Sequence, residues 1–176
     1  GKRDLRVAKT LHNLSGIAFY RKRTDEAGRL LERALAIREA ALPADDLDLA
    51  GSREALALLR QKQGRPAEAV ALLARLAATV EKVYGPAHPN FGKTLLNLGL
   101  ARAGLGEAEA ARKLLERALA IDEKALAPDH PQLVRALASL ADFDFAHGRY
   151  ARAEPLYRRL VALRARGVSY EGWNRT

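Results

Sequence analysis

GEAEAARKLLERALAIDEKALAPDHP, the segment from Gly106 to Pro131, recurs along the chain and decides its fold. A related segment, GRPAEAVALLARLAATVEKVYGPAHP, begins 42 residues earlier at Gly64, and GRYARAEPLYRRLVALRARG begins 42 residues later at Gly148. A fourth, KRTDEAGRLLERALAIREAALPADD, begins at Lys22. A fixed period of this size is typical of proteins built from stacked repeats. We therefore expect four copies of one structural repeat.

Each repeat is predicted to contain two helices. In the third repeat, apolar residues at near-helical spacing indicate helices over 91–105 and 107–125. Gly106 separates them, and Pro128 and Pro131 prevent the second helix from continuing. The same pattern predicts helices over 5–21, 25–41, 47–63, 66–83, 132–146 and 150–166.

Small residues recur at one position of each helix. They are Ser15, Ala57, Gly99 and Ala141 in the first helix and Ala27, Ala69, Ala111 and Ala153 in the second. Small side chains there allow two helix backbones to approach closely. The first repeat has Lys22 in place of the turn glycine, so we expect its turn to be less sharply specified. The second repeat has Arg53 where the others have Leu.

The composition limits the classes of structure available. The chain has 176 residues, of which 48% are hydrophobic and 6% aromatic, and it is rich in the helix formers Ala and Leu. It has no Cys, which excludes disulfides, thiolate catalysis and cysteine–metal sites. No apolar run reaches the roughly 18 residues of a membrane span. The absence of Cys fits a reducing compartment and no signal peptide is visible, so we expect a cytoplasmic protein. We also expect a segment excised from a larger protein, because the chain lacks Met and opens with GKRDLRVAKT.

These repeats resemble the tetratricopeptide repeat, a helix–turn–helix unit of about 34 residues. Eight further residues make about two helical turns, which leaves the helix faces in phase. The 42-residue form resembles the repeats of kinesin light chain and of many bacterial proteins. The matching residues are Asn97, Leu98, Gly106, Ala111, Arg117–Leu119, Ile121, Glu123–Lys124 and Pro128–Pro131.

The resemblance implies an all-α, right-handed α-solenoid of four helix-turn-helix repeats with eight helices. One array would cover residues 1–176, with repeats at approximately 5–46, 47–89, 90–131 and 132–167 and a short C-terminal tail over 168–176. It also implies a non-enzymatic scaffold for protein–protein interaction, whose first helices line a concave surface.

A polar stripe on each first helix is the candidate binding surface. Its members are Lys9, Asn13, Gly16 and Tyr20, then Gly51, Ala55, Leu58 and Lys62, then Lys93, Asn97, Leu100 and Gly104, and finally Arg135, Ser139, Asp142 and Ala146. An Asn side chain both donates to and accepts from a peptide backbone, and a nearby cation pairs with an acidic residue. The alternative is an ordinary solvated helix surface.

By resemblance to peptide-binding members of the family, some stripe residues are expected to bind an extended, acidic segment of a partner protein. The set is Lys9, Asn13, Tyr20, Lys93, Asn97, Arg135 and Ser139.

Two other partners follow from the charge and the repeat pattern. A net charge of +9 raises the possibility of nucleic-acid binding. No aromatic residues interleave with the basic ones as stacking platforms, so a nucleic-acid-binding surface is the less favoured alternative. The second alternative is a homo-oligomer that forms through the end faces of the array or through the tail.

Catalytic chemistry is not expected. His88 and His130 lie 42 residues apart, each before Pro, which predicts that they are turn residues. His12 and His147 have no metal-ligand spacing. No nucleophile or phosphate-loop motif is present. We therefore expect no enzyme activity, no metal and no cofactor.

The tail leaves the repeat pattern. It contains Tyr170, Glu171 and Trp173, which is the only Trp in the chain. This aromatic–acidic cluster is expected either to cap the apolar face of the last repeat or to occupy the groove as a ligand would.

Overall fold

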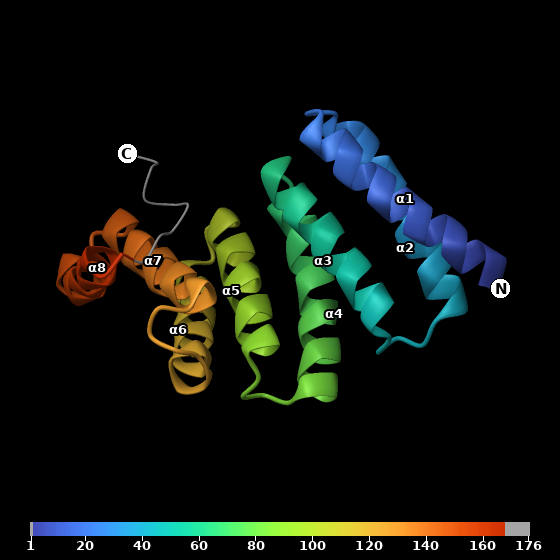
Figure 1. The fold of residues 1–176 in the computed structure, drawn as a ribbon. Helices are drawn as coiled ribbons and strands as arrows, with labels where there is room; N and C mark the ends of the chain where they lie inside the picture. The colour runs from blue at the N-terminus through green and yellow to red at the C-terminus, as the bar shows by residue number, and fades with distance from the viewer. Residues whose placement is uncertain (1, 168–176) are drawn as a thin grey trace. The chain divides into compact units, whose positions relative to one another are not determined.

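The computed structural model describes residues 2–167, and there it contains helices and turns without a strand (Figure 1). The helices are α1 (Lys2–Tyr20), α2 (Thr24–Ala41), α3 (Leu47–Lys62), α4 (Pro66–Tyr84), α5 (Pro89–Gly104), α6 (Ala108–Ala125), α7 (Pro131–Ala146) and α8 (Tyr150–Ala165). The chain divides into two compact units. Unit 1 comprises residues 1–83, and unit 2 comprises residues 84–176. The prediction of an all-α protein with four helix-turn-helix repeats is confirmed. The predicted roles of the tail fall outside the described residues.

The predicted turn histidines cap helices. His88 precedes α5 and His130 precedes α7, and each imidazole Nδ1 accepts a hydrogen bond of 3.1 Å from the backbone N–H two residues later. Pro89 and Pro131 are therefore the first residues of their helices, where a missing N–H costs nothing. Pro131 begins α7 as well as following α6. At the equivalent position before α3, Asp46 accepts from Asp48 N–H at 2.8 Å.

The turn at Lys22 is as well defined as the glycine turns, which corrects the expectation from sequence. Lys22 has a φ of 61°, and Gly64, Gly106 and Gly148 have φ values of 69°, 78° and 70°. Its N–H donates to Phe19 O at 2.9 Å, and the next N–H donates to Ala18 O at 2.9 Å. These two bonds close the end of α1 and hold Lys22 in the left-handed region, where a side chain is strained.

Unit 1 is held by an apolar core shared by α1, α2 and α3. Its buried members are Ala18, Ala27, Leu31, Leu35, Leu49, Leu56 and Leu59. Arg53, which replaces Leu in this repeat, is 7% exposed. Its guanidinium donates to Ala44 O at 3.2 Å and pairs with Glu39 at 3.4 Å. Thr79 of α4 donates to the same carbonyl at 3.2 Å, which ties α4 to the connection between α2 and α3.

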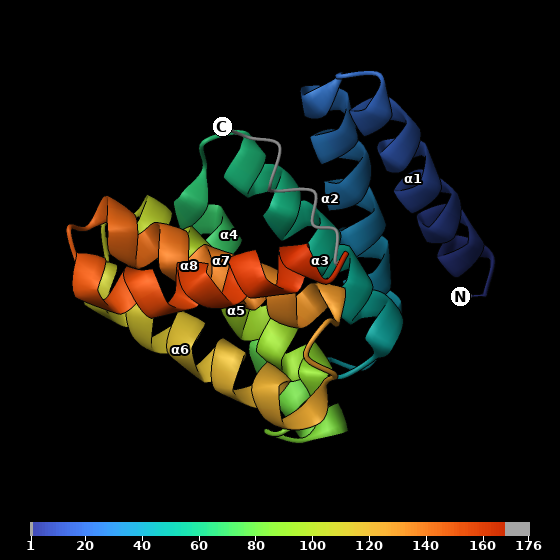
Figure 2. The same ribbon diagram turned by 60° about the vertical axis from the view of Figure 1, so that its left-hand side comes forward.

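Unit 2 confirms the predicted close approach at the small residues. A Cβ on Gly99 of α5 would lie 3.1 Å from the carbonyl oxygen of Ala111 and 3.0 Å from the side chain of Leu115 on α6. A larger residue would force the two helices apart. In the second helix pair, α7 and α8 lie side by side (Figures 1 and 2).

Candidate functional site

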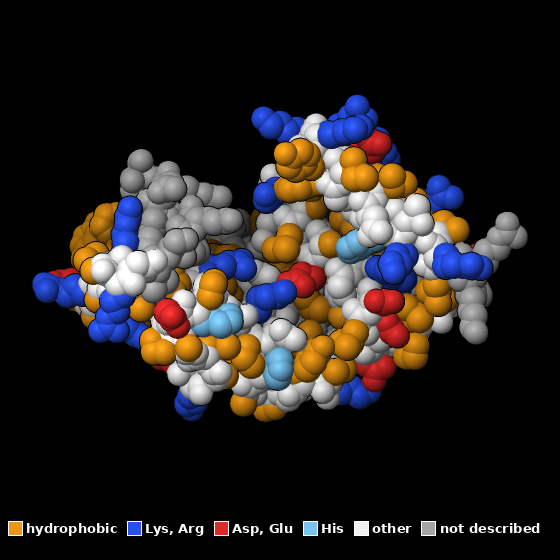
Figure 3. Space-filling model, in the orientation of Figure 1, with side chains coloured by type: hydrophobic (Ala, Val, Ile, Leu, Met, Phe, Trp, Pro, Cys, Tyr) orange, Lys and Arg blue, Asp and Glu red, His pale blue; other side chains and the backbone are white. Residues whose placement is uncertain are grey.

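A pocket of about 500 Å³ lies between α1, α2 and α3 of unit 1. Its lining is mostly apolar, and its floor includes Ala27 and Leu31 of α2. Five members of the polar stripe contribute to its wall: Asn13, Gly16, Ala55, Leu58 and Lys62. Hydrophobic and basic side chains are both exposed over α1 and α3 (Figure 3). The stripes of α1 and α3 therefore line the same cavity.

A cation stands beside an aromatic ring in this pocket. The Lys62 ammonium lies 4.5 Å from the centroid of the Phe19 ring, which is a cation–π distance. Phe19 is 38% exposed, and Leu58, on the opposite wall, is 36% exposed. No carboxylate of the described residues lies within ion-pair distance of Lys62. The pocket therefore offers an apolar surface for a side chain and an unneutralised positive charge beside it.

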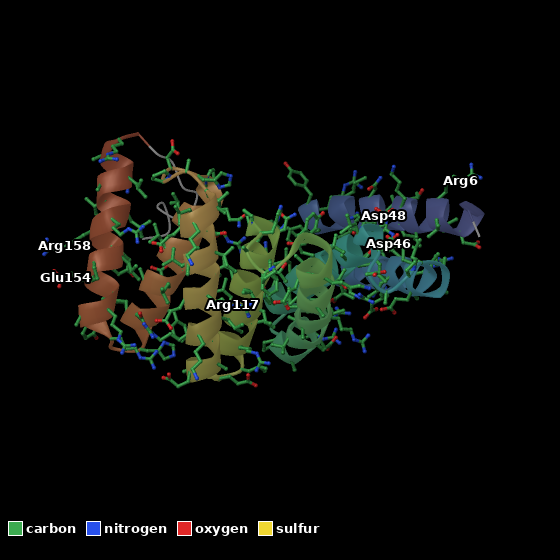
Figure 4. The ribbon with its side chains drawn as sticks, turned by 90° about the horizontal axis from the view of Figure 1, so that it is seen from below. Arg6, Asp46, Asp48, Arg117, Glu154 and Arg158 are labelled. Carbon is green, nitrogen blue, oxygen red and sulfur yellow. The ribbon has the colours of Figure 1, made fainter. Side chains whose placement is uncertain are left out.

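His12 contributes an imidazole to the pocket wall. Burial lowers its pKa first, the Arg38 guanidinium lowers it further, and the Asp48 carboxylate opposes them. Its Nδ1 is buried and finds no hydrogen-bond partner among the described residues. Arg38 donates to Ser52 Oγ, and Asp48 lies in the first turn of α3 (Figure 4). Lys62 supplies a positive charge to the pocket lining.

The predicted residues of unit 1 separate into two groups. Asn13 lines the pocket. Lys9 and Tyr20 are exposed on α1, Tyr20 by 89%, but neither lines it. Phe19 and Lys62 line it although the predicted set omits them. Lys62 could have been found, because it is the fourth member of its stripe.

In unit 2 the predicted residues form a different arrangement. Asn97 was expected to face an open groove, but it is 1% exposed, and its Oδ1 accepts a hydrogen bond of 2.6 Å from Arg135 Nη2. Lys93, Arg135 and Ser139 are half-buried. No carboxylate among the described residues lies within ion-pair distance of Arg135. Asn97 thus orients a guanidinium on the next first helix. Their roles in binding stay predictions.

The most deeply buried charges of unit 2 join helices. Asp144 of α7 is 0% exposed and pairs with Arg112 of α6 at 2.8 Å and with Arg149 at 3.7 Å. The hydrogen bond to Asp144 is the main cause that raises the pKa of Arg112. Within the described part of the chain, no group of three or more His, Asp or Glu side chains is placed to hold a metal ion.

Four helical hairpins with a shared 42-residue register define a helical-repeat protein of the α-solenoid class. The chain belongs to the tetratricopeptide repeat family, since the family's sequence model matches residues 6–75, 48–124 and 91–166. No curated protein matches the chain. None of the described helices is long and apolar enough to cross a membrane.

Solved structures share the fold. A crystal structure of the Podosopora anserina protein described as a kinesin light chain with nearly identical TPR-like repeats has a TM-score of 0.78 and 28% identity, covering 91% of this chain and 76% of that one. BtubC (BKLC) from P. vanneervenii has a TM-score of 0.82 and 21% identity, covering 93% and 65%. A Rap protein complexed with competence and sporulation factor has a TM-score of 0.74 and 19% identity, covering 92% and 43%.

Proposed function

We propose that this chain is a non-enzymatic scaffold that holds an extended, acidic segment of a partner protein, with an apolar side chain of that segment in the pocket of unit 1. Tetratricopeptide repeats in general mediate protein–protein interaction. The observation that carries the proposal is the pocket itself, in which two members of the α1 stripe and three members of the α3 stripe line an apolar cavity, with the Lys62 cation beside the Phe19 ring.

The side chains that line the pocket of unit 1 indicate which kind of peptide would bind there. Burying one large apolar side chain stabilises a complex by about 1.5–3 kcal/mol. A carboxylate next to that side chain would pair with Lys62, which contributes up to about 1 kcal/mol at an exposed site. The carboxamide of Asn13 can both donate to and accept from the peptide backbone. The ligand is therefore an extended segment in which an acidic residue neighbours a large apolar one.

The net charge of +9 agrees with an acidic partner, because the long-range field accelerates association with negatively charged segments. The Rap structure in complex with competence and sporulation factor gives an example of this fold holding a second molecule. These observations support the class of ligand without naming the protein that supplies it.

Gly16 provides a sharp test. It lies on the pocket wall, and a Cβ placed on it meets no atom within 4 Å. The variant Gly16→Leu should fill the cavity, while leucine in a helix interior stabilises the fold by about 0.5–1 kcal/mol relative to glycine. Gly51 of α3 is the matched control, since its Cβ also meets nothing within 4 Å but the residue is outside the pocket.

The probe is a panel of fluorescein-labelled 12-residue acidic peptides that differ only at a central Leu, Phe, Trp or Ala. Fluorescence anisotropy should show binding of a large apolar member to the wild type and to Gly51→Leu, and at least a tenfold loss for Gly16→Leu. Equal binding by both variants would overturn the proposal, as would a panel in which the Ala peptide binds as well as the others.

A second candidate is association of copies through the end face of α1. Val7, Leu14 and Ile17 are 42%, 44% and 52% exposed. Their counterparts one repeat later are Leu49, Leu56 and Leu59, which are 1%, 4% and 4% exposed. Sedimentation velocity over a wide concentration range tests this candidate, and Leu14→Glu should abolish any oligomer. A sedimentation coefficient that does not change with concentration would rule it out.

A further inference from the structure

The outer face of the last helical hairpin in unit 2 exposes large apolar side chains. Phe145 of α7 is 56% exposed, and Tyr150 and Val161 of α8 are 62% and 69% exposed. With Ala153 and Tyr157 they line a groove of about 660 Å³ along α8. The Phe145 ring meets the rings of Tyr150 and Tyr157 edge to face, at centroid distances of 5.4 Å and 6.2 Å.

The groove residues of α8 occupy repeat positions that are buried in the preceding repeat. Tyr157 and Val161 occupy the positions of Leu115 and Leu119 one repeat earlier. On α6, which packs against both α5 and α7, the Leu115 side chain lies beside Gly99 of α5 and Leu119 is 7% exposed. Val161, at the position of Leu119, is 69% exposed, so this face of α8 lacks the cover that the same face of α6 has, and its apolar side chains favour an apolar occupant.

Polar groups at the groove are fixed in place. Tyr157 donates its hydroxyl proton to Asp142 Oδ1 at 2.7 Å, and its pKa is raised to about 12, first by burial and then by Asp142. Glu154 accepts from Arg158 Nη2 at 2.6 Å, and both side chains point away from α8 (Figure 4). The other charged residues of α8 are Arg152, Arg159 and Arg164, of which Arg159 pairs with Glu123 at 2.6 Å. This excess of positive charge favours an occupant that combines aromatic and acidic residues.

We infer that the occupant of this groove is the chain's own segment 168–176, VSYEGWNRT. It supplies Tyr170 and Trp173 as apolar groups and Glu171 as the acid. It follows Gly167, whose φ of 83° and N–H bond to Arg164 O at 2.9 Å end α8 in a left-handed turn. The groove begins close by, because Ala165 lines it.

The length of the segment fits the groove. Nine extended residues span up to about 30 Å, whereas α8, with 16 residues, is about 24 Å long. The segment can therefore run back along the whole helix. Because it is tethered at the end of α8, its effective concentration at the groove is in the millimolar range, so a weak intrinsic affinity suffices to keep it bound.

The single tryptophan makes the inference measurable in the full chain. We expect the fluorescence of Trp173 to be blue-shifted relative to N-acetyltryptophanamide in the same buffer and protected from acrylamide. Val161→Glu should shift the emission to the red and increase quenching, and Tyr150→Ser should do the same. Val83→Glu, the same type of substitution at a valine of unit 1 that is 43% exposed and outside both the pocket and the end face of α1, should leave the emission unchanged. Circular dichroism melting checks that every variant folds.

Three outcomes would overturn the inference. The first is emission at the position of the free amide. The second is a red shift on dilution, which would mean that the tail binds a second copy. The third is blue-shifted emission that responds to Gly16→Leu but not to Val161→Glu, which would place the tail in the pocket of unit 1. The first two outcomes leave the acidic-peptide panel unchanged, and the third would show the tail in the pocket that the panel probes. A panel without a difference between Gly16→Leu and Gly51→Leu leaves the response of Trp173 to Val161→Glu unaffected, so the two proposals fail separately.

Discussion

The guanidinium of Arg112 on α6 binds the carboxylate of Asp144 on α7 through two hydrogen bonds, Nε to Oδ1 at 2.8 Å and Nη2 to Oδ2 at 3.4 Å. Asp144 is 0% exposed, and the Arg112 side chain is 13% exposed. A buried pair of this kind fixes the geometry of two helices, and its value to stability depends on both partners being present.

Removing one partner of this pair should destabilise unit 2. Asp144→Ala removes the buried carboxylate and leaves Arg112 with only the pair to Glu116 at 2.7 Å, so we expect the free energy of unfolding to fall by up to about 3–5 kcal/mol. The double variant Arg112→Met, Asp144→Leu should lose much less. Urea unfolding measures both. Glu154→Ala, which breaks the exposed pair with Arg158, is the control and should change stability by less than about 1 kcal/mol. A double variant as unstable as Asp144→Ala would contradict the account.

Replacing the lysine in the first turn should stabilise unit 1. Lys22 has a φ of 61°, which glycine adopts without strain. We expect Lys22→Gly to raise the free energy of unfolding by about 0.5–1 kcal/mol, because relief of strain exceeds the extra entropy of the unfolded chain. Gly64→Ala, at the equivalent position with φ 69°, should have the opposite sign. Thermal melts test both variants, and destabilisation by Lys22→Gly would show that the lysine is not strained.

Asp122 should make the stability of unit 2 depend on pH. Burial is the main cause that raises its pKa above the ordinary 3.8, against the opposing hydrogen bond from Gln132 and the charge of His130. A carboxyl group with a raised pKa in the folded state binds its proton more tightly there. Its favourable contribution is complete below the unfolded pKa and is lost as pH rises through the folded pKa.

Asp122→Asn removes that dependence while keeping an oxygen that can accept from Gln132 Nε2. Its stability relative to the wild type should therefore increase as pH rises above about 4 and then level off. Asp129→Asn, at an exposed position in the loop between α6 and α7, is the control substitution. Urea midpoints measured at several pH values decide the matter. A relative stability of Asp122→Asn that falls with rising pH would contradict the account.

The repeat pattern predicted the fold because the constraint is local and recurs. Ala111 and Gly99 are small in the sequence for a reason visible in the structure, namely the close approach of α5 and α6. The turn at Lys22 was less predictable, because its hydrogen bonds and not its residue type select the left-handed conformation.

The candidate site could be predicted only in part. Helical spacing identified the stripe that includes Asn13, and the stripe does reach the pocket. It could not show that Asn97 is buried and accepts a hydrogen bond from Arg135, because Arg135 lies on a different first helix. Nor could it show that Lys62 stands over Phe19, since that contact joins α1 and α3. Contacts between helices of different repeats are absent from the pattern of any single helix.

A charge-exchange cycle on Lys62 tests the central claim most directly. The probe is the tightest-binding acidic peptide of the panel, together with a partner peptide in which the acid next to the apolar residue is replaced by Lys. Anisotropy titrations with the wild type and Lys62→Glu complete the cycle, and Arg33→Glu on the outer helix α2 gives the same change of charge as a control. The account predicts that Lys62→Glu weakens binding of the acidic peptide and restores part of the affinity for the Lys peptide. Arg33→Glu should have neither effect. Equal effects of Lys62→Glu and Arg33→Glu on both peptides would contradict it.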